Sequence, residues 1–132
     1  MWCFNLIGSI LFPLLPISPK SPITISMPTS PLTIPFPVPD EHDKRLLESS
    51  GMRSGYVSLA PGEAVGQHTT GDCEELLIPL SGSGELRIPG QPALTVAPGR
   101  VLYNPPSTEH DMVNTGSEPL VYIYVVVRPC SG

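Results

Sequence analysis

Basic residues are scarce in this sequence. Its 132 residues include seven Lys and Arg against twelve Asp and Glu, which gives a formal net charge of −5. Nucleic acids and anionic membranes are bound by clustered basic side chains, so neither is an expected partner. Cysteine is also scarce, and Cys3, Cys73 and Cys130 form no C-x-x-C pair. A disulfide framework would need more cysteines, so we expect a reducing, cytoplasmic compartment.

Uninterrupted helical patterns are missing as well. Eighteen prolines and twelve glycines punctuate the chain so often that no long amphipathic helix fits, which favours an all-β fold. No Gly-rich loop precedes a helical pattern, and no serine lies in a G-x-S-x-G setting. Phosphate-loop and serine-hydrolase chemistry are therefore not indicated.

The first 17 residues are apolar enough to suggest a signal peptide or a membrane anchor. No Lys or Arg precedes them, and the run is shorter than the roughly 20 residues that a spanning helix needs. Pro13 and Pro16 would also break such a helix. A tail or a mis-assigned start, with Met27 as the true one, is the preferred interpretation, and an export signal is the alternative.

Residues 1–39 form a proline-rich segment with nine of the eighteen prolines and one charged side chain, Lys20. Such a segment has few backbone donors and favours extended or polyproline conformations. We expect an irregular N-terminal tail with one edge strand at residues 32–38.

Residues 40–54 form a polar lead-in in which a short helical turn is expected at 44–48. Residues 55–129 then show short apolar or alternating runs separated by turn dipeptides, which is typical of an antiparallel sandwich or barrel. The expected strands are residues 56–60, 67–70, 74–80, 85–88, 93–96, 100–104, 110–114 and 120–127.

Three side chains from distant parts of the chain could converge on one pocket. Because side chains alternate along a strand, His68 and Thr70 share a face of one strand, and Glu75 and Leu77 share a face of the next. His110 and Met112 share a face of a strand further along the chain. Two imidazoles and one carboxylate form a suitable ligand set for a divalent transition metal, with positions left for water or substrate. Glu74 is the alternative to Glu75 if the strand is shifted by one residue.

Two segments carry the spacing of a known family. Gly62, His68, Glu75 and Gly82 fit G-x5-H-x-H-x3,4-E-x6-G, and Gly99, Pro105, His110 and Asn114 fit G-x5-P-x-G-x2-H-x3-N. These are the two motifs of the cupin superfamily, which residues 55–127 resemble. The resemblance implies a small single-domain, jelly-roll-like antiparallel β-barrel of the RmlC-like type, often dimeric.

The resemblance also implies metal ligation by His68, Glu75 and His110. The metal would be Fe, Zn, Ni, Cu or Mn. Two residues depart from the motifs: Thr70 replaces the second His, and Ser107 replaces a Gly. Thr70 is expected to orient a metal-bound water, and Cys73 is a possible substitute ligand for the missing His.

Several other side chains near the motifs have an ordinary structural explanation. Tyr103 and Met112 are candidates for the pocket lining, although such residues in a small barrel usually belong to the core. Asn114 is expected to be a turn or ladder residue, and Asp111 a surface residue.

Two functional hypotheses follow. The first is a mononuclear metal-binding cupin acting on a small polar molecule in a dioxygenase- or isomerase-like reaction. The second is a metal-free barrel that binds a small ligand as a sensor or carrier, which the substitution at Thr70 keeps open. Function belongs to the site rather than to the fold, so metal content is what discriminates them.

Overall fold

The computed structural model describes residues 28–37 and 43–130, and within these the regular structure is entirely β. The expected tail start, the alternative start at Met27 and most of the proline-rich segment lie outside the described residues. The nine strands are β1 (Asp43–Glu48), β2 (Met52–Leu59), β3 (His68–Thr69), β4 (Glu74–Ser81), β5 (Gly84–Arg87), β6 (Leu94–Val96), β7 (Leu102–Asn104), β8 (Glu109–Val113) and β9 (Leu120–Val127).

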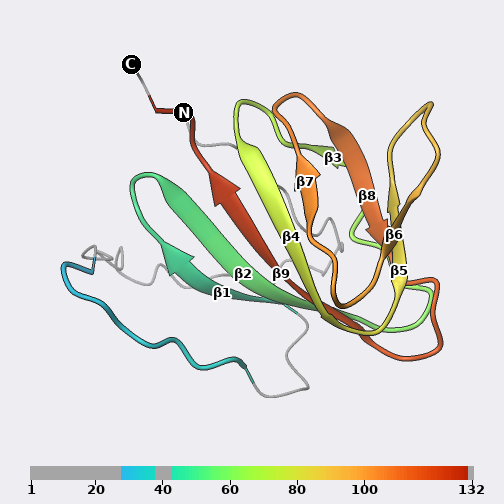
Figure 1. Ribbon diagram of the computed structural model, residues 1–132, viewed down its shortest axis with the longest axis horizontal. Coiled ribbons are helices and arrows are strands. Elements are labelled where there is room, and N and C mark those ends of the chain that lie inside the picture. Colours follow the sequence, from blue (N-terminus) through green and yellow to red (C-terminus); the bar gives the residue numbers. More distant parts are fainter. Residues whose placement is uncertain (1–27, 38–42, 131–132) are drawn as a thin grey trace, which may run out of the picture.

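The strands form two antiparallel sheets (Figure 1). The five-stranded sheet has the order β1-β2-β9-β4-β7, and the four-stranded sheet has the order β3-β8-β5-β6. The expected antiparallel, jelly-roll-like architecture is confirmed. It is built as two sheets, and the described strand pairings do not connect them into a continuous closed barrel.

The core lies between the sheets. β9 shows why, because its alternate residues Leu120, Tyr122, Tyr124 and Val126 are buried while those between them are more exposed. This period of two turns one face of each strand inward. Leu86, Val96 and Met112 supply the facing apolar surface from the four-stranded sheet. Met112 is thus a core residue, paired with Leu86 across β5 and β8.

The expected helical turn at 44–48 is wrong, because this segment forms β1. It pairs along β2 with a register shift between Arg45 and Leu47. Local helix propensity is a weak preference, and the hydrogen bonds that β2 offers along its free edge outweigh it. The sequence around β1 gives little warning, since most of its side chains are polar and only half-buried or exposed.

The expected edge strand at 32–38 is also wrong for the described part of that range. Residues 28–37 have no regular structure, and Val38 lies outside the described residues. Pro31, Pro35 and Pro37 have no N–H to donate to a ladder. The segment nevertheless touches the sheet, because the Phe36 ring lies 5.9 Å from that of Tyr56 on β2.

Two of the connections that cross between the sheets, β3 to β4 and β7 to β8, lie within the two motifs. β3 and β8 are paired in one sheet, with His68 opposite His110. β4 and β7 are paired in the other, with Glu75 opposite Asn104. Residues of both sheets therefore meet at one end of the core, which is where the candidate site is found.

Candidate metal centre

His68, Glu75 and His110 form one cluster. One donor atom from each lies within 4.8 Å of the other two. Glu75 and His110 are 2% and 1% exposed, whereas His68 is only half-buried. The two imidazole rings meet edge to face with centroids 4.3 Å apart. The three residues that the motif spacing singled out are thus brought together, although they come from three strands.

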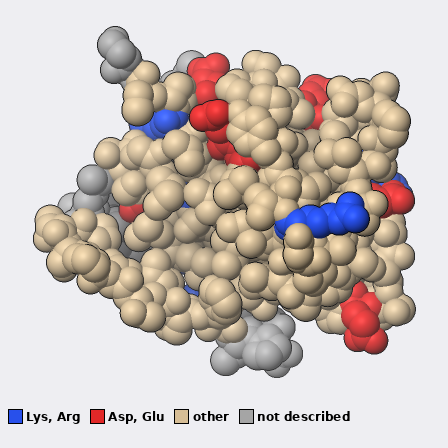
Figure 2. Space-filling view, in the orientation of Figure 1, with Lys and Arg blue, Asp and Glu red and all other residues tan. Residues whose placement is uncertain are grey.

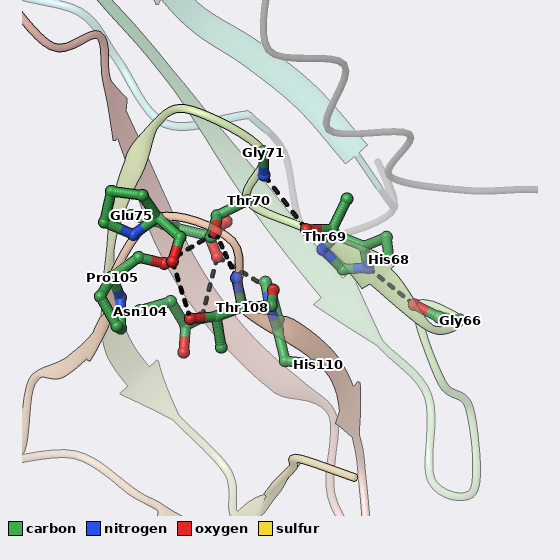
Figure 3. Close-up of polar contacts among 11 residues, drawn as sticks. Gly66, His68, Thr69, Thr70, Gly71, Glu75, Asn104, Pro105, Thr108 and His110 are labelled. Carbon is green, nitrogen blue, oxygen red and sulfur yellow. Dashed lines mark hydrogen bonds and ion pairs between the residues drawn. The ribbon is translucent and has the colours of Figure 1, made fainter.

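Glu75, and not Glu74, is the carboxylate of this cluster. Asn104 donates a hydrogen bond from Nδ2 to Glu75 Oε2 over 3.0 Å, and both side chains are buried (Figure 3). Glu74 faces outward and accepts a hydrogen bond from the Tyr103 hydroxyl. Tyr103 is 53% exposed, so its expected place in the pocket is wrong. Alternation about the buried Asn104 turns Tyr103 to the outside.

Each histidine is oriented by a backbone carbonyl. His68 Nδ1 lies 2.7 Å from the oxygen of Gly66, and His110 Nδ1 lies 3.0 Å from that of Thr108 (Figure 3). A carbonyl oxygen only accepts, so both Nδ1 atoms carry a hydrogen. The Nε2 atoms are therefore the ones left to bind a cation. Hydrogen bonds of this kind fix the tautomer and the ring direction of metal-binding histidines.

His110 and Glu75 also contact each other directly, with Nε2 2.9 Å from Oε2. Burial alone would lower the pKa of His110, but its hydrogen bond with Glu75 and the charge of Glu75 raise it above its ordinary value. Burial likewise works to raise the pKa of Glu75, and the hydrogen bond and charge of His110 lower it. Both shifts favour the form of the pair in which His110 is an imidazolium, with a hydrogen on Nε2, and Glu75 is a carboxylate.

His68 behaves differently. Burial lowers its pKa, and the nearby charge of His110 acts in the same direction. The hydrogen bond with Gly66 opposes this shift but does not cancel it. His68 is therefore the neutral imidazole of the cluster at neutral pH.

This donor set fits a divalent transition metal. Two imidazole nitrogens and one carboxylate oxygen are its common ligands, and each already has the outer hydrogen bond that such ligands need. The hydrogen between His110 Nε2 and Glu75 Oε2 sits between two atoms that would both turn toward a cation. Imidazole and carboxylate donors suit each of Fe, Zn, Ni, Cu and Mn.

Thr70 does not take the place of a ligand. Its hydroxyl donates to the Pro105 carbonyl over 2.7 Å and accepts from the Thr108 N–H over 3.0 Å. The Thr70 N–H in turn donates to the Thr108 carbonyl. The expected role in orienting a metal-bound water is replaced by a structural one, because this hydroxyl holds the loop that leads to His110 (Figure 3).

Cys73 is not available as a substitute ligand either. It is 1% exposed, packs in the core cluster, and its sulfur is disulfide-bonded. A sulfur in a disulfide offers no thiolate to a metal. The idea that Cys73 compensates for the missing histidine is therefore wrong for this structure.

Two further residues complete the description of the motifs. Asn114 is confirmed as a turn residue: Nδ2 donates to the carbonyls of Leu59 and Glu118, and Oδ1 accepts from the Gly116 N–H. Asn104 was missed by the sequence analysis. Its only signal is that it precedes Pro105 by one residue within an expected strand, and the register against Glu75 becomes visible only in the sheet.

Comparison with known proteins identifies the family. A family model described as "Cupin domain" matches residues 55–126, which is more than half of the chain. The chain belongs to the cupin family. A comparison with curated proteins finds no significant match.

Solved cupin structures show the same fold. An RmlC-like cupin family protein from Methanocaldococcus jannaschii has 18% identity and a TM-score of 0.65, with 74% of this chain and 91% of that chain covered. A predicted oxalate decarboxylase from Thermotoga maritima has 23% identity and a TM-score of 0.61, with 66% of this chain and 79% of that chain covered. The cupin domain of an XRE family transcriptional regulator from Enterobacter cloacae has 22% identity and a TM-score of 0.59, with 66% of this chain and 95% of that chain covered. At such identities the likeness concerns the fold.

Proposed function

We propose that this cupin binds one divalent transition metal through His68 Nε2, His110 Nε2 and a carboxylate oxygen of Glu75. The observation that carries the proposal is that each of these side chains is already oriented by a hydrogen bond of its own. Glu75 accepts from Asn104, and each histidine donates from Nδ1 to a backbone carbonyl. When bound, such an ion would act as a Lewis acid toward a small polar molecule. The reaction class that we favour is dioxygenase- or isomerase-like, on a small-molecule substrate.

The chain's own contribution to such chemistry is orientation and proton storage. His110 and Glu75 share a hydrogen inside the core, where water has little access to either side chain. Binding of a cation would displace that hydrogen, and the hydrogen bond from Asn104 would continue to orient Glu75. The pair can therefore take up or release one proton as the centre fills or empties.

Elemental analysis of purified protein tests this proposal. After dialysis against Zn, Fe, Mn, Ni and Cu salts in turn, we expect close to one ion per chain. A His68→Ala/His110→Ala double variant should lose it. His42→Ala is the matched control, because it removes the third histidine of the chain, which lies outside both motifs. Failure of the wild type to hold any of these ions would contradict the proposal.

A metal-free, ligand-binding cupin is the second candidate function. It is favoured by one specific observation: His110 and Glu75 satisfy each other without an ion, at 2.9 Å. The regulator-type cupin domain among the similar structures has no more than its fold in common with this chain. A protein that stays metal-free under all the salts above, yet binds small polar ligands in a thermal-shift screen, would establish this alternative.

We also propose a homodimer. The five-stranded sheet ends in the short strand β7, in which Tyr103 is 53% exposed, and Val101 just before it is 58% exposed. An exposed sheet edge with apolar side chains is a surface that a second copy can cover. Light scattering coupled to size exclusion should give twice the chain mass, 14.1 kDa, and a monomer would contradict the idea.

Nucleic acid and membranes are not proposed as partners. On the face drawn in Figure 2, the basic side chains lie apart from one another and form no patch. Among the described residues, no helix is long and apolar enough to cross a membrane. A cytoplasmic location remains a prediction from the cysteine pattern. The disulfide at Cys73 argues against it, because a disulfide needs oxidising conditions to persist. Thiol titration of protein from its native cells tests it.

A further inference from the structure

His68 is held by less regular structure than the other two candidate ligands. Its strand β3 has two residues and lies at the edge of the four-stranded sheet, where it pairs only with β8. Glu75 and His110, in contrast, lie in the longer strands β4 and β8 and are almost fully buried. Two backbone pairs are a weak restraint on a side chain, so the direction of the His68 ring has to be fixed by something else.

The segment before His68 follows β8 and then leaves it. Val65 donates its N–H to the Met112 carbonyl, and Ala64 bridges to Val113. Pairing resumes at His68 opposite His110. His68 comes four residues after Ala64, whereas His110 comes three residues before Val113. The chain before His68 thus contains one extra residue, which is the arrangement of a β-bulge.

Gly66 is where the bulge turns. Its φ is +102°, a region that residues with a Cβ rarely adopt. At this break no backbone carbonyl of β8 accepts the Gly66 N–H. The side chain of Asp111 does so instead, with Oδ1 2.8 Å from the Gly66 nitrogen. On the other side of the same residue, the Gly66 carbonyl accepts from His68 Nδ1 over 2.7 Å (Figure 3).

Asp111 and His68 therefore interact through one residue, Gly66. We propose that Asp111 is a positioning residue for His68: by holding the Gly66 N–H it sets the bulge so that the Gly66 carbonyl selects the Nδ1–H tautomer and turns Nε2 to the centre. The assignment of a metal to that Nε2 rests on the proposed function. The tautomer and the ring direction of His68 are independent of whether a metal binds.

The same two strands offer a matched control. The side chain of Gln67 donates to Glu109 Oε2 over 3.0 Å, so Glu109 also ties this segment to β8. It does so through a side chain, however, and does not touch the Gly66 peptide. Loss of the Glu109 contact should leave His68 unchanged, while loss of the Asp111 contact should not.

The first test reads the tautomer in the metal-free protein, so that it stays decisive if the protein binds no metal. Long-range ¹H–¹⁵N correlation spectra at pH 8 report which ring nitrogen carries the hydrogen. Wild type, Glu109→Ala, which removes the acceptor of Gln67, and Asp111→Asn, which keeps an oxygen acceptor, should show His68 as the Nδ1–H form. Asp111→Ala should show a mixture with the Nε2–H form. A wild-type tautomer in Asp111→Ala would overturn the proposal.

The second test measures Zn²⁺ affinity by competition with a chromophoric chelator. Loss of an outer hydrogen-bonding partner typically weakens metal binding by about 10- to 100-fold, and we expect this of Asp111→Ala. Asp111→Asn should stay within a few-fold of wild type, and Glu109→Ala should bind Zn²⁺ as tightly as wild type. Equal weakening by Glu109→Ala and Asp111→Ala would overturn the specific role. If Asp111→Ala does not fold, Asp111→Glu replaces it in both tests, because the extra methylene moves the acceptor while keeping the charge.

Discussion

The Nε2 atom of His110 lies 2.9 Å from the Oε2 atom of Glu75, inside the core and across the boundary between the two sheets. His110 uses its other nitrogen on the Thr108 carbonyl, so both of its ring nitrogens point at acceptors. Only the imidazolium form can donate to both. The metal-free centre therefore holds a buried ion pair, and the first prediction concerns its dependence on pH.

The ion pair should stabilise the metal-free protein only within a window of pH. The folded pKa of His110 is above its unfolded value of 6.5, so its contribution is present below pH 6.5 and is lost as pH rises through the raised pKa. The folded pKa of Glu75 is below 4.5, so its contribution is present above pH 4.5 and is lost as pH falls through the lowered pKa. The pair is fully effective between these limits.

Chemical unfolding of chelator-treated wild type and Glu75→Gln measures this effect. The difference in the free energy of unfolding should reach about 2 kcal/mol near pH 5.5 and shrink toward higher and lower pH. Taking the difference removes the opposite contribution of His68, whose lowered pKa costs stability as pH falls below 6.5. A difference that does not vary with pH would contradict the ion pair.

Replacement of Thr70 should loosen the loop that leads to His110. Thr70→Val keeps the shape but removes the hydroxyl that bonds Pro105 and Thr108, so the free energy of unfolding should fall by about 2 kcal/mol. Thr70→Ser retains the hydroxyl and loses one methyl group, for a cost of about 1 kcal/mol. Urea unfolding compares the two variants. A Val variant as stable as the Ser variant would contradict the stabilising role of the hydroxyl.

Ser107 is a strained position that glycine should relieve. Its φ of +57° makes it the one non-glycine residue with a positive φ in the described part of the chain. This conformation costs a side-chain-bearing residue about 1–2 kcal/mol, part of which is returned as chain entropy in the unfolded state. Ser107→Gly should thus raise the free energy of unfolding by about 0.5–1 kcal/mol. Ser117→Gly, at an exposed bend with ordinary φ, is the control and should lower it.

Gly55 is required by the ring of Tyr124. A Cβ at this position of β2 would lie 2.4 Å from three atoms of that side chain. Gly55→Ala should therefore cost about 2–3 kcal/mol through overpacking. Gly51→Ala, with nothing within 4 Å of the added carbon, should change stability by less than about 0.5 kcal/mol. Similar thermal midpoints for the two variants would show that the ring moves aside freely.

The sequence allowed the fold and the three central residues to be predicted because both depend on short-range spacing. β9 begins and ends where its β-branched and aromatic run does, at Leu120 and Val127. His68, Glu75 and His110 lie at fixed distances from turn glycines and prolines, so the motif places them before any contact is known. That part of the prediction needed no knowledge of pairing.

The residues that were missed or misassigned depend on pairing across the sheets. Asn104 meets Glu75 through the β4–β7 register, and Tyr103 is turned outward by the same register. Asp111 was expected at the surface, yet it reaches the Gly66 N–H because a bulge leaves that group without a backbone acceptor. β1 is a strand because β2 offers a free edge. None of these facts is local in the chain.

The two-residue length of β3 has a kinetic consequence. Short edge strands open at much lower free energy than the interior of a sheet. If His68 leaves with β3 while Glu75 and His110 stay in place, the centre can exchange an ion without unfolding of either sheet. The rate of filling and emptying would then follow the opening of residues 66–71, and amide hydrogen exchange at Thr70 would report it.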